Sequence, residues 1–89
     1  MGKMILIYRI SPEEIEETDR IEKEIEEKIK EFGELRDTKR RPIAFGLEAI
    51  EIAIVTEAKG NEGITEEIEN ALKEIKGVSS VENTGMNLL

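Results

Sequence analysis

Residues 41–55 read Arg-Pro-Ile-Ala-Phe-Gly-Leu-Glu-Ala-Ile-Glu-Ile-Ala-Ile-Val, a short connection followed by an alternating run. Pro42 fixes its own φ and favours an extended Arg41, while Gly46 permits backbone angles that other residues avoid. The run from Glu48 to Thr56 alternates with the period of a β-strand. We predict that one side of this strand faces the helices and consists of Ile50, Ile52 and Ile54.

Phe45 is one of only two phenylalanines in the chain, and it stands in this connection between two strand-like segments. One interpretation is that its ring closes one end of the core while the loop merely joins two strands. The other is that the ring is an exposed aromatic group presented to a partner protein.

Two further strands are expected in the same sheet. Met4 to Ile10 is an almost continuous apolar run, as expected of a central strand. Glu34 to Arg41 is too charged for the middle of a sheet and is predicted as an edge strand, where lysine and arginine discourage pairing with other molecules. The cationic run Lys39-Arg40-Arg41 leads directly into the connection.

Two helices are predicted from apolar stripes at helical spacing. The first runs from about Thr18 to Phe32, with Gly33 as a left-handed cap; residues 12–17 form a turn or a short helical lead-in. A capping box at residues 11–14 would place Pro12 at a first helical position, and residues 18–22 offer a second start. The second helix is capped by Thr65 and closed by Gly77. The stripes are Ile21, Ile25, Ile29 and Phe32, and Ile68, Ala71, Leu72 and Ile75.

The end of the chain is predicted as a short strand around Ser80 to Asn83 and a tail from Thr84 to Leu89, either frayed or packed against the sheet. Glu57 to Gly63 is predicted as a loop. The elements then follow the order βαββαβ, which is typical of a ferredoxin-like α+β sandwich. We expect a single domain over residues 1–89. Its four-stranded antiparallel sheet has the order 4-1-3-2, with two helices on one face.

Composition narrows the classes of function. The net charge of −8 argues against nucleic acid or an anionic membrane as the main partner. The chain has no histidine and no cysteine, so the commonest general base, the thiol nucleophile and cysteine-based metal sites are excluded. We therefore expect no catalytic residue, no cofactor and no metal, and a protein that acts by binding. The apolar run Met4 to Tyr8 is too short for a membrane span, which favours a cytoplasmic location.

The segment Pro42 to Leu47 with the alternating run after it, and Lys76-Gly77-Val78 before the last strand, resembles the archaeal elongation factor 1-beta family. The similarity covers essentially the whole chain. The family consists of nucleotide exchange factors of translation. The resemblance implies a guanine nucleotide exchange factor for the GTPase elongation factor 1-alpha, which releases GDP so that GTP and then aminoacyl-tRNA can bind.

The resemblance also implies where this GTPase binds. We expect Phe45, with Ile43 and Leu47 beside it, to enter an apolar pocket of elongation factor 1-alpha, and the tail to be a second contact. The factor should be monomeric alone. The expected partner-binding residues are Arg41, Pro42, Ile43, Ala44, Phe45, Gly46 and Leu47, together with Met86, Asn87, Leu88 and Leu89.

At the tail the chain departs from the family's eukaryotic relatives, which end in Lys-Leu with a lysine that reaches the magnesium region of the GTPase. Here Leu88 occupies the penultimate position. Either the tail acts by steric displacement, or Lys59 or Lys76 serves instead, or metal disruption is not the main route. We favour the tail as a contact, and expect its deletion from Met86 onward to slow exchange without unfolding the domain.

A different class of function is a small ferredoxin-like module for ligand sensing or dimerisation. In that case the loop from Glu57 to Gly63 would bind a metabolite, and edge strands would pair between subunits. The charged edge strand from Glu34 to Arg41 speaks against such pairing.

Overall fold

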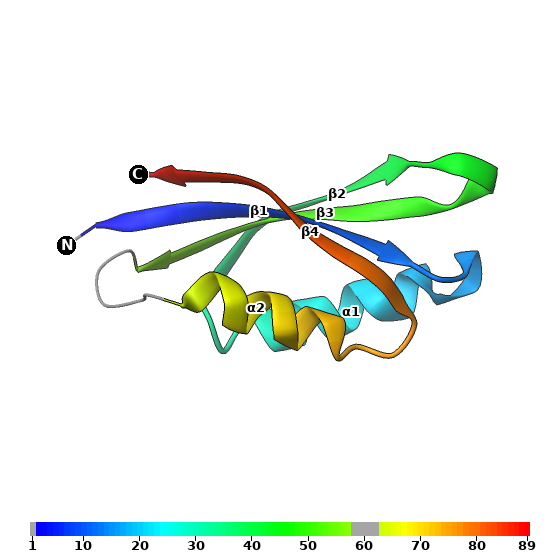
Figure 1. Ribbon diagram of the computed structural model, residues 1–89, viewed down its shortest axis with the longest axis horizontal. Helices are drawn as coiled ribbons and strands as arrows, with labels where there is room; N and C mark the ends of the chain where they lie inside the picture. The colour runs from blue at the N-terminus through cyan, green and yellow to red at the C-terminus, as the bar shows by residue number, and fades with distance from the viewer. Residues whose placement is uncertain (1, 58–62) are drawn as a thin grey trace.

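The computed structural model describes residues 2–57 and 63–89, and Figure 1 shows the predicted order of strands and helices. The order βαββαβ is thereby confirmed. Among the described residues, no helix is long and apolar enough to cross a bilayer. The elements are β1 (Lys3–Pro12), the 3-10 turn η1 (Ile15–Glu17), α1 (Thr18–Ile29), β2 (Glu34–Pro42), the 3-10 turn η2 (Ala44–Gly46), β3 (Glu48–Glu57), α2 (Ile64–Lys73) and β4 (Val78–Leu88).

The four strands form one antiparallel sheet in the order β2-β3-β1-β4, which is the predicted order 4-1-3-2 counted from the other edge. Tyr8 of β1 and Thr38 of β2 both lie opposite Ile52 of β3. Both helices lie on the same face of the sheet (Figure 1). The fold is therefore the expected ferredoxin-like sandwich, and the charged strand β2 is at an edge.

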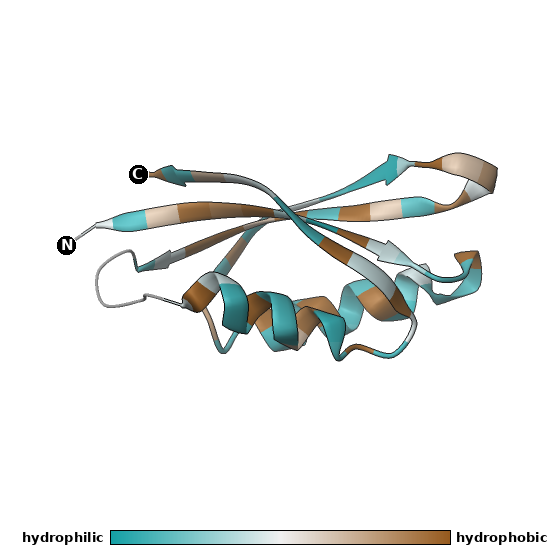
Figure 2. Ribbon diagram, viewed as in Figure 1, coloured by the Kyte–Doolittle hydropathy of each residue, from teal (hydrophilic) through white to brown (hydrophobic). Residues whose placement is uncertain are grey.

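The core fills the layer between this face of the sheet and the helices. The alternating bands in Figure 2 follow the period-2 pattern of the strands. The isoleucine side of β3 belongs to the core as predicted, while Ala49, Ala53 and Val55 on its other side are buried as well. Burial of each large aliphatic side chain contributes about 1.5–3 kcal/mol. The buried residues include Met4, Leu6, Tyr8 and Ile10 of β1, Ile21, Ile25 and Ile29 of α1, Ile50, Ile52 and Ile54 of β3, and Ile64, Ile68, Leu72 and Ile75 in and after α2.

Pro12 is the last residue of β1 and not a first helical residue, so the capping box proposed at residues 11–14 does not form a helix start. Pro12 is buried, and it lies opposite Val78 at a shift in the β1–β4 register. A bulge tolerates proline because no regular ladder hydrogen bond needs its nitrogen. The amide of Glu13 continues the contact by donating to the carbonyl of Gly77 at 2.8 Å.

Helix α1 begins at Thr18 as predicted, but it ends at Ile29 and not at Phe32. The amides of Phe32 and Gly33 both donate to the carbonyl of Ile29, at 2.8 and 3.0 Å, and so close the last turn. Gly33 does not have the predicted left-handed φ, since the positive-φ glycines in the described chain are Gly46, Gly63 and Gly77.

Gly33 is instead a point of close approach between the turn after α1 and the backbone of β3. A Cβ atom added to Gly33 would lie 2.3 Å from the carbonyl oxygen of Val55 and 3.2 Å from Cβ of Thr56. The hydroxyl of Thr56 donates to the carbonyl of Phe32 at 2.9 Å and holds the two segments together. The glycine is therefore required by packing and not by its own φ.

The second helix starts two residues earlier than expected. Helix α2 begins at Ile64, and its N-cap is Gly63 with a φ of 85°. Thr65 therefore lies inside the first turn and is not the cap. Gly77 has the predicted left-handed φ, at 94°, but the helix already ends at Lys73. Residues 58–62 of the predicted loop lie outside the described residues.

Strand β4 continues to Leu88, so the prediction of a short strand around Ser80 to Asn83 was wrong. Met86 and Leu88 lie opposite Leu6 and Met4 of β1, and the amide of Leu89 donates to the carbonyl of Lys3 at 2.8 Å. A frayed tail is thus also wrong. Backbone hydrogen bonds to β1 hold these residues in the sheet. Such bonds do not require alternating apolar side chains, so the sequence Asn-Thr-Gly-Met-Asn gave no sign of a strand.

Tyr8 is a buried core residue whose hydroxyl donates to the carbonyl of Thr65 at 3.2 Å. We expect Tyr8→Phe to lower the free energy of unfolding by about 1 kcal/mol, because the Thr65 carbonyl loses its donor. Burial raises the pKa of Tyr8 above its ordinary value of 10.0. The unfolded chain therefore loses this proton first.

The resulting stability contribution is present below pH 10 and is lost as pH rises through the folded-state pKa of Tyr8. Urea titrations between pH 8 and pH 11 should show that the free energy of unfolding of the natural chain falls as pH rises. The fall should be smaller for Tyr8→Phe, which has no phenol to titrate. Equal declines in the two proteins would assign the alkaline transition to other groups.

Candidate partner-binding surface

The connection between β2 and β3 is a closed, hydrogen-bonded tip at one end of the molecule (Figure 1). The amide of Ile43 donates to the carbonyl of Leu47 at 2.8 Å, and the amide of Leu47 donates back to the carbonyl of Ala44 at 3.2 Å. Pro42 ends β2, and Gly46 adopts a φ of 80°. The predicted short, stiff connection is therefore present.

Phe45 has a φ of 60° and a ψ of 32°, which is the left-handed region that non-glycine residues avoid. No other non-glycine residue in the described ranges 2–57 and 63–89 has a positive φ. This conformation costs about 1–2 kcal/mol for an L-residue. The two hydrogen bonds that close the tip hold the backbone of Phe45 in this conformation.

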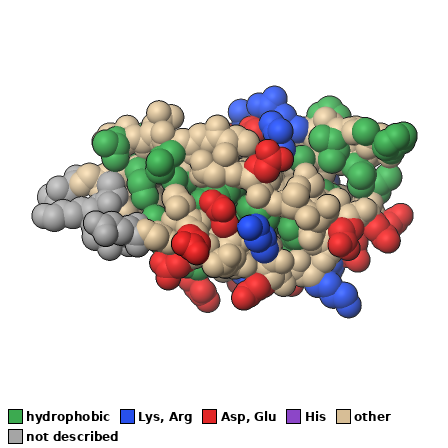
Figure 3. Space-filling model, in the orientation of Figure 1, with side chains coloured by type: hydrophobic (Ala, Val, Ile, Leu, Met, Phe, Trp, Pro, Cys, Tyr) green, Lys and Arg blue, Asp and Glu red, His purple; other side chains and the backbone are tan. Residues whose placement is uncertain are grey.

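The ring of Phe45 is 95% exposed, so the interpretation in which it closes the core is wrong. Ile43 beside it is 41% exposed. Figure 3 shows apolar side chains gathered at this end of the molecule, with acidic side chains close beneath them. An exposed aromatic ring on a strained, hydrogen-bonded loop is the arrangement expected of a binding anchor.

The structure adds a residue to this surface that the sequence did not single out. Ile15 of η1 is 53% exposed, and its Cδ1 would lie 3.5 Å from a Cβ atom placed on Gly46. A shallow groove of about 290 Å³ separates the η1 segment from the tip; it is lined by Glu13, Glu14, Ile15, Glu16, Phe45 and Leu47. Ile15 does not fall on the helical spacing of the buried residues Ile21, Ile25 and Ile29. This mismatch in the sequence could have identified Ile15 as an exposed residue.

The cationic run before the tip is engaged within the chain. Arg40 donates to Asp19 at 2.7 Å and to Glu22 at 2.9 Å, and thereby ties β2 to the start of α1. These hydrogen bonds hold the pKa of Arg40 above its ordinary value. Arg41 pairs with Glu51 at 3.2 Å, and Lys39 with Asp37 at 3.7 Å. Arg40 therefore links the hairpin to α1, whereas the ion pairs of Arg41 and Lys39 stay within the sheet.

The tail lies at the opposite end of the molecule from Phe45, next to the N-terminus (Figure 1). Its apolar side chains are exposed although its backbone is paired: Met86 is 59%, Leu88 77% and Leu89 65% exposed. The structure therefore does not bring the two predicted groups of partner-binding residues together. They form two separate surfaces on a protein about 43 Å long.

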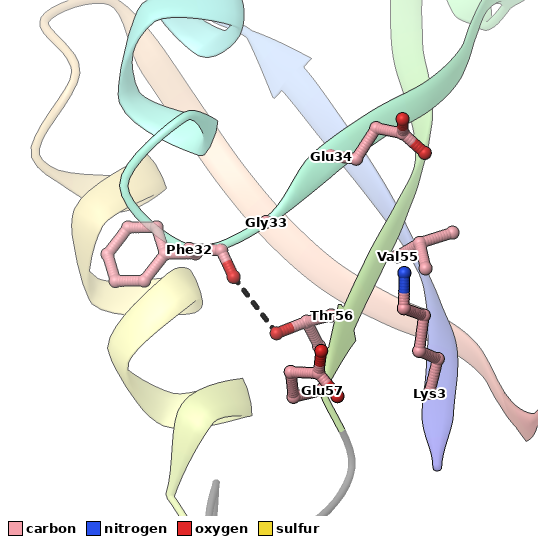
Figure 4. A pocket seen from close by; sticks show the side chains of 7 residues that line it. All are labelled: Lys3, Phe32, Gly33, Glu34, Val55, Thr56 and Glu57. Atoms are coloured by element: carbon pink, nitrogen blue, oxygen red, sulfur yellow. Dashed lines mark hydrogen bonds between the residues drawn. The ribbon is translucent and has the colours of Figure 1, made fainter. Parts of the chain in front are cut away.

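A second groove, of about 310 Å³, lies where the turn after α1 meets the ends of β1 and β3. Figure 4 shows Lys3, Glu34 and Glu57 around it, with the hydrogen bond from Thr56 to the Phe32 carbonyl on its wall. Among the described residues, no group of three or more acidic side chains could hold a metal ion. This groove offers mixed charges and no convergent set of catalytic groups.

Comparison with known proteins shows which family this chain belongs to. Residues 5–89 match the EF-1 guanine nucleotide exchange domain. The chain belongs to this family. It is 38% identical to an elongation factor 1-beta of Desulfurococcus amylolyticus and 37% identical to one of Methanothermobacter thermautotrophicus, covering all of this chain and 99% of each relative. An elongation factor 1-beta of Methanocaldococcus jannaschii is 48% identical, over 72% of this chain and 75% of the relative.

The resemblance inferred from the residues around Phe45 is thus confirmed, and with it a function in guanine nucleotide exchange. In this exchange domain the match includes both the Phe45 tip and the tail, because it extends from residue 5 to residue 89. Which of its residues contact a GTPase stays a prediction.

Proposed function

We propose that this exchange domain accelerates GDP release from elongation factor 1-alpha by binding alone, with the Phe45 tip as its principal anchor. The observation that carries the proposal is the 95% exposed ring of Phe45 on a hydrogen-bonded, left-handed loop. No covalent step is required for exchange, which agrees with a sequence that lacks histidine and cysteine.

The mechanism follows from linkage between two binding equilibria. An exchange factor that binds the nucleotide-free GTPase more tightly than the GDP form must weaken GDP binding by the same factor. An aromatic ring on a hydrogen-bonded backbone suits this role because little backbone entropy is lost on docking. The strain at Phe45 is already present in the free protein, so the partner need not induce this conformation.

The tail is proposed as a second contact through the exposed side chains of Met86, Leu88 and Leu89. Because it lies at the other end of the sheet from Phe45, a single GTPase that touches both must span most of the factor. Sites so far apart, with no shared partner residues, should contribute additively to binding.

The fold limits which lysine could take the place of the penultimate lysine of the eukaryotic relatives. Lys76 precedes β4, whereas the tail is the far end of the same eleven-residue strand, so Lys76 cannot act at the position of the tail. Lys59 lies outside the described residues. The lysine beside the tail is Lys3, whose carbonyl accepts the Leu89 amide. We retain the tail as an apolar contact that displaces partner groups sterically.

Deleting the tail no longer isolates its role, because deletion would also unpair the end of β1. We expect the double variant Met86→Ala, Leu88→Ala to slow catalysed GDP release about three- to tenfold while stability stays nearly constant, since exposed side chains contribute little to folding. Stopped-flow release and thermal melts measure the two effects. Ser80→Ala, at the other end of β4, is the control. An unchanged release rate in the double variant would remove the tail from the mechanism.

The primary test is the release of a fluorescent GDP analogue from the elongation factor 1-alpha of the same organism, with and without this protein. Acceleration at substoichiometric amounts would support catalytic exchange. No acceleration, with no complex in size-exclusion chromatography, would refute the proposal and favour the ligand-sensing or dimerisation module. The factor should elute as a monomer alone and shift only with its GTPase.

A further inference from the structure

The groove between η1 and the Phe45 tip joins two apolar side chains that are far apart in the sequence. Ile15 and Phe45 are the most exposed large apolar residues near this end, at 53% and 95%, and both line the groove. The close approach of Ile15 to Gly46 sets them side by side. Two neighbouring apolar anchors make a larger and more specific contact than a lone ring.

Three carboxylates border this groove: Glu13, Glu14 and Glu16. All three are exposed, and none of them has an ion pair within the part of the chain that the structure describes. The neighbouring acidic residues are different, because Glu17 and Glu24 pair with Arg20 and Asp19 and Glu22 pair with Arg40. The groove therefore carries uncompensated negative charge around an apolar centre.

The negative charge of this groove favours some binding partners over others. A second copy would bring the same three carboxylates together in a chain whose net charge is already −8, and an anionic membrane would be repelled. The remaining fit is a protein surface with an apolar pocket bordered by lysine or arginine side chains. Complementary rim charges of this kind act mainly on the rate of association and on its salt dependence.

We propose that Ile15 and Phe45 form one docking surface, and that Glu13, Glu14 and Glu16 direct it to a cation-bordered apolar pocket on the GTPase. The inference rests on the proposed exchange function and extends it to residues outside the β2–β3 tip. Helix α1 runs away from this surface toward the opposite end of the molecule (Figure 1), so carboxylates near its end and in the turn after it serve as controls for net charge.

The test compares the triple variant Glu13→Gln, Glu14→Gln, Glu16→Gln with the control Glu26→Gln, Glu27→Gln, Glu31→Gln. Both remove three exposed carboxylates, so the change in net charge is matched. The readout is the slope of the GDP release rate against factor concentration, in 0.05 M and 0.5 M salt. At low salt we expect the slope of the groove variant to fall about tenfold, and that of the control to fall less than about twofold.

In 0.5 M salt the natural chain and the groove variant should agree within about twofold, because screening shortens the range of the carboxylates to a few ångströms. Ile15→Ala should lower the slope about five- to tenfold at both salt concentrations, since its contribution is apolar. Circular dichroism and thermal melts establish that each variant is folded.

The outcomes separate the inference from the function on which it rests. Exchange by the natural chain with no specific loss in the groove variant or in Ile15→Ala would overturn the inference and leave the proposed function standing. A natural chain without exchange activity would overturn both. Self-association that strengthens when the three carboxylates are neutralised would reassign this surface to a second copy of the chain.

Discussion

Replacing Phe45 by alanine is expected to raise the concentration of factor needed for half-maximal GDP release by about 30- to 1000-fold, the loss typical of a central aromatic anchor worth about 2–4 kcal/mol. The ring is 95% exposed in the free protein, so its removal uncovers no core residue. The free energy of unfolding should therefore change by less than about 0.5 kcal/mol. Titrations of GDP release and urea unfolding curves measure the two quantities separately.

Phe45→Gly is the informative companion of this variant. Glycine adopts a φ of 60° without strain, so the substitution should stabilise the fold by about 1 kcal/mol while still removing the anchor. Stability and exchange would then move in opposite directions, which no general damage to the fold can produce. Full exchange activity in a folded Phe45→Ala protein would show that the ring is not the anchor.

Gly33→Ala is expected to lower the free energy of unfolding by about 3 kcal/mol, near the upper end of the usual cost of overpacking. The added Cβ would stand 2.3 Å from the carbonyl oxygen of Val55, which belongs to the backbone of a central strand and cannot rotate away. For a chain of this size the loss corresponds to a fall in melting temperature of roughly 12–24 °C.

Gly63→Ala is the matched control for the effect at Gly33. Gly63 has a φ of 85°, but an added Cβ would meet no atom within 4 Å. Its cost is conformational only, about 1–2 kcal/mol. If Gly33→Ala were no more destabilising than Gly63→Ala, the close approach of the α1–β2 turn to β3 would not limit stability.

The predictions that succeeded rest on periodic patterns of side chains. The alternation from Glu48 to Thr56 and the four-residue spacing of Ile21, Ile25 and Ile29 each identify a buried face, because burial acts on every second or every third to fourth residue. The edge position of β2 followed from its lysines and arginines. Once the buried faces were assigned, the βαββαβ order of strands and helices left only a few possible topologies.

The predictions that failed concern single residues whose role is set by distant neighbours. Gly33 was interpreted as a helix cap, although the Val55 carbonyl decides its identity. The capping-box pattern at residues 11–14 offered Pro12 as one of two helix starts, although pairing with Val78 keeps it in β1. The tail could be predicted only as either frayed or packed against the sheet, because its sequence has no alternation, and the structure shows that its backbone is paired along β1 up to Leu88.

For the candidate site too, some features could be predicted from the sequence and others only from the tertiary structure. The sequence by itself determined that Pro42 to Leu47 is a short, stiff connection with an unusual phenylalanine, because proline and glycine restrict or release the backbone locally. Only the tertiary structure decided that this ring faces solvent and that Ile15, thirty residues earlier, lies beside it. Tertiary structure also placed the tail at the other end of the molecule. The physical reason is that burial and proximity depend on how the strands and helices pack, and side-chain periodicity carries no information about contacts between loops.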